Sequence, residues 1–403
     1  MIFDSHYILE RMNKGKSDQE TFSEQDILDF LTSQSEATEN SIVDTQEFNK
    51  NLLFAFSDLR LKLAENMKLD NVLFLFGNGS SIYAGSQDTR EFKLEEYQSK
   101  YSDISAIIDE VKKLEGIEEQ LNALTTVYSY YRLTKDESKI KLVNKLIGEI
   151  KAVLIGKYVN SVDYGKLSLH ELFFLKLRSF GCLERTGIYT LNYDLAFEYL
   201  LDKLAIEYKD GFSGFINRIF NPRTLQEKDK TELVKIHGSV NWTEEDGIIK
   251  EYQPKFKDGK IRIDDTLPVL IYPTFHKMYQ TYGAPYSELM RHMLDKMKTG
   301  KNVIVVLGYK YGDDHINNIL FKSLENPNNI FYFFIYDQEE KGNFIEQIKR
   351  LAVTMPNVNI FIGKILADFK AFVTYMLPAT PEQSDKEKVI ELLQKVLVNN
   401  AGS

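Results

Sequence analysis

The chain has 403 residues with 59 acidic and 50 basic side chains, a net charge of −9, and this length fits one large or two medium domains. Hydrophobic residues at 43% and charged residues at 27% are typical of a folded globular protein, and no apolar run approaches the roughly 18 residues that a membrane span requires. The acidic balance, without any basic block, argues against direct nucleic-acid binding, because such binding depends on clustered Lys and Arg.

Residues 1 to 66 predict a helical N-terminal extension. Its first residues contain no continuous apolar segment after a basic stretch, so we expect no secretory signal and a cytoplasmic protein. Residues 11 to 46 are mostly polar, apart from a short apolar pattern at helical spacing between Ile27 and Leu31. From Thr45 to Leu63 apolar residues recur every three or four positions, which predicts an amphipathic helix packed on a core.

Residues 67 to 377 predict an α/β domain. Residues 71 to 76 form an apolar run that stops at clustered glycines, as a buried parallel strand entering a turn does. Residues 90 to 180 show helical periodicity and predict an inserted helical layer. Strand and helix patterns then alternate, with strands expected at 187–191, 233–236, 269–271, 303–307, 330–336 and 358–362 and helices from about 195 and at 287–298, 314–324, 342–351 and 367–375. This alternation predicts a Rossmann-like, doubly wound, mainly parallel sheet with helices on both faces.

Residues 378 to 403 predict a C-terminal helical tail after a proline-marked break. The apolar residues between 381 and 398 lie at helical spacing. Such a helix either docks on its own domain or contacts a second molecule, and the sequence leaves both open.

Four expected strand ends carry unusual residues, and ligands of open α/β sheets bind beyond such ends. The first is Gly77-Asn-Gly-Ser-Ser81, whose glycines, hydroxyls and N–H groups suit an anion, although a plain tight turn explains the pattern as well. The second is Thr190-Leu-Asn-Tyr-Asp194, where Asn192 and Asp194 either face a ligand or cap the next helix.

The other two strand ends contain histidine and acidic residues. In Lys235-Ile-His-Gly-Ser-Val-Asn-Trp242, the imidazole of His237 either accepts a proton from a ribose hydroxyl or is hydrogen-bonded in the core. In Gly308-Tyr-Lys-Tyr-Gly-Asp-Asp-His315, one of the two adjacent acids caps the following helix, and the sequence does not decide which acid is functional. We expect all four segments to line one cleft. The remaining histidines, His170 among them, we interpret as packing or helix-start residues, because no set of them has metal-ligand spacing.

Together these four motifs, spread over roughly residues 70 to 340, resemble the zinc-less bacterial sirtuin-like proteins of antiphage defence systems. The resemblance implies a domain that binds NAD and cleaves its bond between nicotinamide and ribose. It implies that Asn192 orients the attacking water and that His237 is the catalytic base. It also implies a set of NAD-binding residues, namely Gly77, Asn78, Gly79, Ser80, Ser81, Asp194, Gly308, Tyr309 and Asp314, with Asp337 as a further candidate at the adenosine ribose.

Two departures from the family pattern affect this expectation. Asn78 stands where the glycine loop usually has Ala, so its side chain either fills pocket space or adds a hydrogen bond. Cys182 is the one cysteine of the chain, so the four-cysteine zinc module of protein-deacylating sirtuins cannot be built, and we expect no zinc. Without that module, hydrolysis of NAD by water is the favoured reaction.

The main hypothesis is therefore an NAD glycohydrolase that produces nicotinamide and ADP-ribose and depletes NAD in antiphage defence. Because uncontrolled activity would kill the host, we expect regulation by assembly, and the resemblance implies a homo-oligomer and a HerA-type ATPase partner. A second hypothesis is a sensor that binds NAD or ADP-ribose without turnover. A third, a nuclease or a nucleic-acid-associated scaffold, is opposed by the acidic balance.

Overall fold

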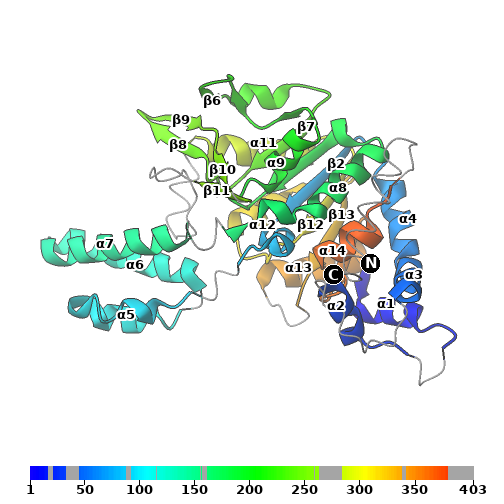
Figure 1. Ribbon diagram of the computed structural model, residues 1–403, viewed down its shortest axis with the longest axis horizontal. Coiled ribbons are helices and arrows are strands. Elements are labelled where there is room, and N and C mark those ends of the chain that lie inside the picture. Colours follow the sequence, from blue (N-terminus) through cyan, green and yellow to red (C-terminus); the bar gives the residue numbers. More distant parts are fainter. Residues whose placement is uncertain are drawn as a thin grey trace.

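An eight-stranded sheet, in which every pair of neighbouring strands is parallel, forms the centre of the molecule (Figure 1). The computed structural model describes residues 1–16, 21–32, 45–87, 92–114, 116–154, 156, 161–257, 259–262, 284–337 and 342–379. Across the sheet the strands are β1 (Ile2–Asp4), β14 (Val358–Ile362), β13 (Ile330–Ile335), β12 (Asn302–Leu307), β2 (Asn71–Phe76), β3 (Thr186–Thr190), β7 (Thr231–Lys235) and β4 (Tyr208–Lys209). The predicted Rossmann-like α/β fold with a parallel sheet is confirmed.

The central strands are apolar along their whole length because helices cover both faces of the sheet. In β2, Val72, Phe74 and Phe76 belong to one core, and Leu73 and Leu75 belong to the core on the opposite face. The first face is covered by α3 (Thr45–Ala55), α4 (Ser57–Asn66), α8 (Ser168–Ser179), α9 (Ala196–Lys203) and α14 (Phe369–Ala371), and the second by α11 (Tyr286–Lys298), α12 (Asp314–Ser323) and α13 (Asn343–Thr354).

The strand order reverses between β2 and β12. The chain passes from β2 to β3 and β7 on one side, and later from β12 to β13 and β14 on the other. At such a switch point the connections leave adjacent strands in opposite directions, which opens a crevice at their carboxyl ends. The glycine-containing segments that follow β2 and β12 are therefore the natural place for a ligand.

The N-terminal segment takes part in the sheet as well as in the helical layer. β1 pairs with β14 at the sheet edge, a strand that the sequence did not predict, and α1 (Ser5–Met12) and α2 (Glu24–Thr32) follow it. The ammonium of Lys370 donates to the carbonyl of Leu31 at 2.9 Å, and Arg60 donates to the carbonyl of Tyr375 at 3.2 Å. These contacts tie the N-terminal helices to the end of the domain at residues 369–376, where α14 continues into a π-helical turn.

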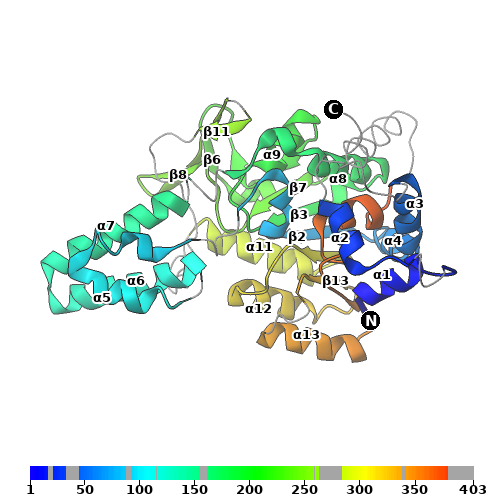
Figure 2. The ribbon, with the colours of Figure 1, turned by 60° about the horizontal axis from the view of Figure 1, so that its bottom comes forward.

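Part of the helical insertion predicted at residues 90–180 forms a lobe that projects from the body (Figures 1 and 2), whereas its last helix, α8, packs on the main sheet. The helices of the lobe are α5 (Ser105–Val111), α6 (Gly116–Thr134) and α7 (Glu137–Val153), and their apolar faces make a small core of their own. Tyr193, from the segment after β3, packs against this core and also against the main core. The lobe thus contacts the body at one of the four motif segments.

A second, antiparallel sheet was not predicted. Its order is β5 (Phe212–Ser213), β6 (Arg218–Phe220), β9 (Ile248–Glu251) and β8 (Trp242–Glu245), and β10 (Lys255–Lys257) and β11 (Lys260–Arg262) make a separate hairpin. These strands have two to four residues and are rich in charged side chains, so they show neither an apolar run nor an alternation long enough to detect.

Two expectations fall outside the described residues, namely the strand at 269–271 and the helix at 381–398 in the predicted C-terminal tail. No helix in the part of the chain that the structure describes is long and apolar enough to cross a membrane.

The buried histidine of α8 generates a prediction about acid stability. His170 lies between the rings of Phe197 and Phe369, and neither ring nitrogen has a hydrogen-bond partner among the described residues. Burial lowers the pKa of His170 to about 4, against the opposing charge of Asp194. Between pH 6.5 and 4 the imidazole of His170 is therefore protonated in the unfolded chain but neutral in the folded chain. The free energy of unfolding consequently falls as the pH drops through this range.

The free energy of unfolding of the wild type falls as the pH is lowered from 7 to 5. We expect this loss to be about 2 kcal/mol smaller in His170→Phe. Urea unfolding at the two pH values measures this loss. The exposed His6, replaced by Gln, serves as the control and leaves the loss unchanged. An equal loss in the wild type and in His170→Phe would show that His170 does not cause the acid sensitivity.

Candidate functional site

The turns after β2 and β12 pack backbone against backbone. The N–H of Gly77 donates to the carbonyl of Leu307 at 3.2 Å, and the N–H of Gly79 donates to the carbonyl of Gly308 at 3.0 Å. A Cβ on Gly77 would lie 2.5 Å from the carbonyl oxygen of Gly308, and one on Gly308 would lie 2.7 Å from the amide nitrogen of Ser80. Gly308 also has φ of +71°, a conformation that only glycine adopts without strain. The contact therefore explains why glycines occur on both sides of the switch point.

The glycine loop after β2 continues as a short 3₁₀ turn over Asn78–Ser80. The N–H of Ser80 donates to the carbonyl of Gly77, and the N–H of Ser81 donates to the carbonyl of Asn78, both at 3.0 Å. With the bonds of Gly77 and Gly79 to the β12 turn, four amides that the sequence offered as anion donors point to main-chain carbonyls in this structure.

The side chain of Asn78 is exposed and turned away from the centre of the loop. It accepts a hydrogen bond from the hydroxyl of Ser86 and donates to the carbonyl of Gln87 at 3.4 Å. Of the two possibilities considered for Asn78, the structure shows the added hydrogen bond.

Asn192 joins the second motif to the glycine loop. Its Nδ2 donates to the hydroxyl of Ser80 at 3.2 Å and to that of Ser81 at 3.0 Å, and its own N–H donates to the hydroxyl of Thr190 at 3.0 Å. The hydroxyl of Ser81 in turn donates to Oδ2 of Asp194 at 3.1 Å. All of these side chains are buried. The two motifs are therefore one hydrogen-bonded unit, although more than a hundred residues separate them.

Buried charged side chains support the segment that carries Asn192. Oδ1 of Asp194 accepts from the N–H of Ala196 at 3.0 Å, as a helix-capping carboxylate does. The ammonium of Lys235 donates to the carbonyls of Tyr193 and Asp194 and lies 3.2 Å from the carboxylate of Glu198. Burial raises the pKa of Glu198, and the neighbouring Lys235 opposes that shift. Lys235 belongs to the third motif, and the sequence predicted no role for it. In the structure its ammonium supports the backbone of the second motif.

His237 and Asp313 connect the third and fourth motifs. Nε2 of His237 lies 3.1 Å from Oδ2 of Asp313, and both side chains are nearly buried. Oδ1 of Asp313 accepts from the N–H of His315 at 2.9 Å and from that of Ile316 at 3.5 Å, which caps α12. The hydroxyl of Tyr309 accepts from the N–H of Asp313 at 2.9 Å. A carboxylate that accepts two backbone N–H groups, on a residue whose own N–H is bonded to Tyr309, thus faces the imidazole.

This pair spans the middle of the sheet edge. His237 follows β7 and Asp313 follows β12, and β2 and β3 lie between these two strands. With neighbouring strands about 4.8 Å apart, β7 and β12 are roughly 14 Å apart, so the two segments must lean toward each other over the ends of β2 and β3. Asn192, Ser80 and Ser81 lie at those ends. The prediction that the four segments line one place is consistent with this geometry.

The remaining predicted residues are placed as follows. Gly308 packs on the glycine loop, and Tyr309 is buried beside it, where its hydroxyl lies 3.1 Å from Oδ1 of Asn317. Asp314 is exposed in the first turn of α12, and Asp337 is exposed after β13.

The structure thus distinguishes between the two adjacent acids that the sequence could not separate. Asp313 is the helix cap and the partner of His237, whereas Asp314 faces outward. The sequence carries no signal that separates the two acids, because Asp313 and Asp314 stand three and two residues before Ile316, the first apolar position of the helix, and either spacing suits an N-cap.

The described residues bring no three His, Cys, Asp or Glu side chains together in the way that a metal site requires. The chemistry offered by the cluster comes from an amide, an imidazole paired with a carboxylate, and two serine hydroxyls.

Fold and site together define a Rossmann-like α/β protein with a polar cluster at the switch point of its sheet. Residues 186–354 match the family model described as SIR2-like domain. Among curated proteins, none matches the chain.

Several solved sirtuin structures are similar in chain course. One, described as the structural basis for sirtuin substrate affinity, is 11% identical with a TM-score of 0.35 and aligns over 78% of this chain and 94% of its own. A Sir2 mutant with a p53 peptide and NAD is 13% identical with a TM-score of 0.37, over 79% and 96%. A mutant Sir2 homologue in complex with ADP-ribose is 12% identical with a TM-score of 0.35, over 85% and 99%.

The backbone contact at the switch point generates a prediction about stability. In Gly77→Ala the new methyl group would meet the carbonyl of Gly308, so the two turns must separate. We expect the free energy of unfolding to fall by about 1–3 kcal/mol, as overpacking of a close contact does. Gly312→Ala on the same β12 segment is the matched control, because nothing lies within 4 Å of its added Cβ. Urea unfolding of the two variants measures the difference, and an equal stability of both would contradict the close contact.

Proposed function

We propose that this chain is an NAD glycohydrolase, which cleaves the bond between nicotinamide and ribose and releases nicotinamide and ADP-ribose. The observation that carries the proposal is the cluster of Asn192, the two loop serines and the His237–Asp313 pair over the ends of β2 and β3. The match of residues 186–354 to the SIR2-like domain supports the choice of NAD as the substrate. The proposal places this activity in residues 67–377.

In the proposed reaction the C1′–N bond breaks with its electron pair on the nicotinamide nitrogen, and the oxygen of water bonds to C1′. Within the described residues, the side-chain hydrogen bonds of Asn192 use Nδ2 alone, so Oδ1 is left to accept from the attacking water and orient it. His237 accepts a proton from a ribose hydroxyl, and that hydroxyl oxygen takes up a proton from the attacking water as the water bonds to C1′. The proton on His237 then passes to solvent, so one proton is released for each NAD cleaved.

Asp313 supports His237 in two ways in this proposal. Its fixed carboxylate orients the ring, and its negative charge stabilises the imidazolium that forms when the ring accepts a proton. This stabilisation matters at the beginning of α12, because the positive end of the helix dipole disfavours a cation there. The Gly77–Ser81 loop would hold the pyrophosphate, Gly308 and Tyr309 would border the adenosine half, and Asp194 would lie on the carboxamide side. Asn78, Tyr309, Asp314 and Asp337 stay binding candidates.

The helical lobe is the proposed cover of the nicotinamide end. Tyr193 packs on the lobe and lies with its ring 6.4 Å from that of His237, so the lobe reaches the site through one aromatic residue. We further propose that the activity serves antiphage defence and is controlled by homo-oligomerisation and by a partner ATPase of the HerA type. An enzyme that depletes NAD needs such control.

One observation favours a second function, an NAD or ADP-ribose sensor without turnover. Four amides of the glycine loop already donate to main-chain carbonyls, and Asn78 is bonded to Ser86. A loop that is internally satisfied must rearrange to hold a pyrophosphate. In a sensor, this rearrangement on ligand binding would cause the change in the assembly state.

The proposal predicts that Asn192→Ala and His237→Ala release nicotinamide at least about 10²-fold more slowly than the wild type, because each variant loses a group that acts in the transition state. Chromatography of nicotinamide and ADP-ribose after incubation with NAD measures the rate. His315→Ala, which is two residues from Asp313, is the control and keeps the rate. A folded wild type that binds NAD but releases nothing, also with a co-encoded ATPase present, would favour the sensor.

The two adjacent acids allow a sharper test of the His237 partner. Asp313→Asn keeps an oxygen that caps α12 but removes the charge that faces the imidazole, so we expect nicotinamide release to fall about 10- to 10²-fold with little change in melting temperature. Asp314→Asn removes the same charge from the exposed neighbour, which is a binding candidate without contact to His237, and keeps the rate at saturating NAD whatever its effect on KM. An equal effect of both substitutions would mean that the net charge near α12 matters and not the contact with His237.

A further inference from the structure

The turn that carries His237 packs on the cores of the main sheet through Ile236 and Val240. Gly238 has φ of +90°, and the following N–H groups bond the turn to itself and to its neighbour: that of Val240 donates to the carbonyl of Tyr193 at 3.1 Å, and that of Trp242 donates to the carbonyl of Ser239 at 3.1 Å. The position of His237 therefore depends on this packing, on the contact with Asp313, and also on what fixes residues 239 to 242 from the other side.

Asn241 makes that connection to the small antiparallel sheet. Its Nδ2 donates to Oε1 of Glu251 at 2.9 Å and to the carbonyl of Tyr252 at 3.3 Å, while its Oδ1 accepts from the hydroxyl of Ser239 at 2.6 Å. The N–H of Tyr252 donates back to the carbonyl of Asn241 at 2.9 Å, and the hydroxyl of Tyr252 donates to the carbonyl of Val240 at 2.7 Å. The turn is thus fastened to the end of β9.

Behind Asn241 lies a buried chain of charges. Glu251 stands directly opposite Arg218 on β6 and opposite Trp242 on β8. NH1 of Arg218 donates to Oε2 of Glu251 at 2.5 Å, and its NH2 donates to Oδ1 and Oδ2 of Asp210 at 2.7 and 2.8 Å. Both carboxylates are 11% exposed, so water contributes little to their stabilisation.

Arg218 is the cation that balances the two buried carboxyl groups of Asp210 and Glu251. Burial, and next the charge of Asp210, raise the pKa of Glu251 to about 8, while Arg218 opposes both effects. Burial likewise raises the pKa of Asp210. Without the guanidinium, two buried carboxyl groups would face each other with no cation between them, and removal of one partner from a buried ion pair destabilises its surroundings strongly.

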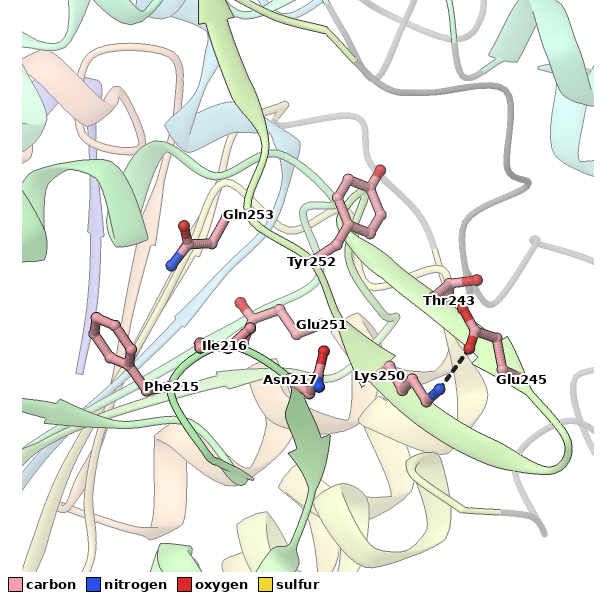
Figure 3. A pocket seen from close by; sticks show the side chains of 9 residues that line it. All are labelled: Phe215, Ile216, Asn217, Thr243, Glu245, Lys250, Glu251, Tyr252 and Gln253. Atoms are coloured by element: carbon pink, nitrogen blue, oxygen red, sulfur yellow. Dashed lines mark hydrogen bonds and ion pairs between the residues drawn. The ribbon is translucent and has the colours of Figure 1, made fainter.

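Among the described residues, the side of Glu251 that faces the cavity has no apolar packing that could hold the turn in place of these ion pairs. A cavity of about 360 Å³ lies between the loop Phe215–Asn217 and the β8–β9 hairpin, with Glu251 on its wall (Figure 3). Phe215 and Ile216 are 84% and 83% exposed, so they do not fill it. Figure 3 also shows the Lys250–Glu245 pair near the end of the hairpin.

We infer that Arg218 and Glu251 are positioning residues of the candidate site, which act through Asn241 to hold the turn that carries His237. This inference rests on the proposed function for its catalytic meaning, but the mechanical coupling stands on the contacts alone. The small sheet is then a clamp on the site, and any molecule that enters the cavity beside Glu251 would act on His237 through two side chains.

Hydrogen exchange followed by mass spectrometry tests the coupling without any need for turnover. Arg218→Met breaks the chain at its far end, and Asn241→Ala cuts it at the turn while the Arg218 ion pairs remain. We expect peptides that contain residues 236–242 to exchange at least tenfold faster in either variant, and no faster in the double variant, because both substitutions remove the same restraint. Lys250→Met, which breaks the exposed ion pair of the same sheet, is the matched control and leaves these peptides protected.

The outcomes separate the clamp from the proposed reaction. Wild-type protection of residues 236–242 in Arg218→Met would overturn the inference, whatever the activity. If Arg218→Met also loses protection in β2 and β12, the fold itself has failed, and Asn241→Ala alone decides by the same criterion. If the wild type releases nicotinamide, the clamp predicts a lower kcat with a KM for NAD within about twofold of the wild type in Asn241→Ala. If it releases none while the exchange results hold, the glycohydrolase proposal fails and the clamp stands.

Discussion

The close approach of two glycine turns at the switch point is the constraint on which the candidate site depends. A methyl group on Gly77 would overlap the carbonyl of Gly308, so β2 and β12 can end in register only with glycine there. This contact places Ser80 and Ser81 over the sheet edge, where their hydroxyls accept from Asn192. The polar cluster is thus assembled from segments that are distant in sequence by a packing requirement of the backbone.

Around that contact, side chains from the segments after β7 and β12 meet over the ends of β2 and β3. His237 and Asp313 come from strands on either side of β2 and β3 and meet above them, each fixed by its own support: Asp313 by the helix that it caps, and His237 by the turn fastened to the small sheet. Buried charges on this scale contribute little to net stability, but they fix geometry when every polar atom has a partner. The site accordingly consists of rigid backbone at the glycine turns and side chains held by ion pairs.

Much of this arrangement was predictable, and the reason lies in the type of signal. The strands of the parallel sheet are continuous apolar runs bounded by glycine or polar residues, and the motifs after β2, β3, β7 and β12 stand out because apolar residues end abruptly at Gly77, Asn192, His237 and Gly308. β1 was not predictable because its three residues pair with β14, which is far away in the chain, and the small sheet was not predictable because its strands of two to four residues show neither an apolar run nor a long alternation. Which of Asp313 and Asp314 is the functional acid was open, since capping and ligand binding favour the same residue types at that position, and the contact of Asp313 with His237 was not predicted. The roles of Lys235 and Asn241 depend on tertiary contacts that no local pattern encodes.

The central claim is that the cluster over β2 and β3 is one NAD site. A crystal structure of His237→Ala soaked with NAD tests it most directly, because this variant is expected to bind the dinucleotide without cleaving it. The proposal predicts density for NAD at the carboxyl ends of β2 and β12, with the pyrophosphate on the Gly77–Ser81 loop and the nicotinamide ribose beside Asn192. Density confined to another part of the molecule, or its absence at saturating NAD with the two glycine turns unchanged, would contradict the claim.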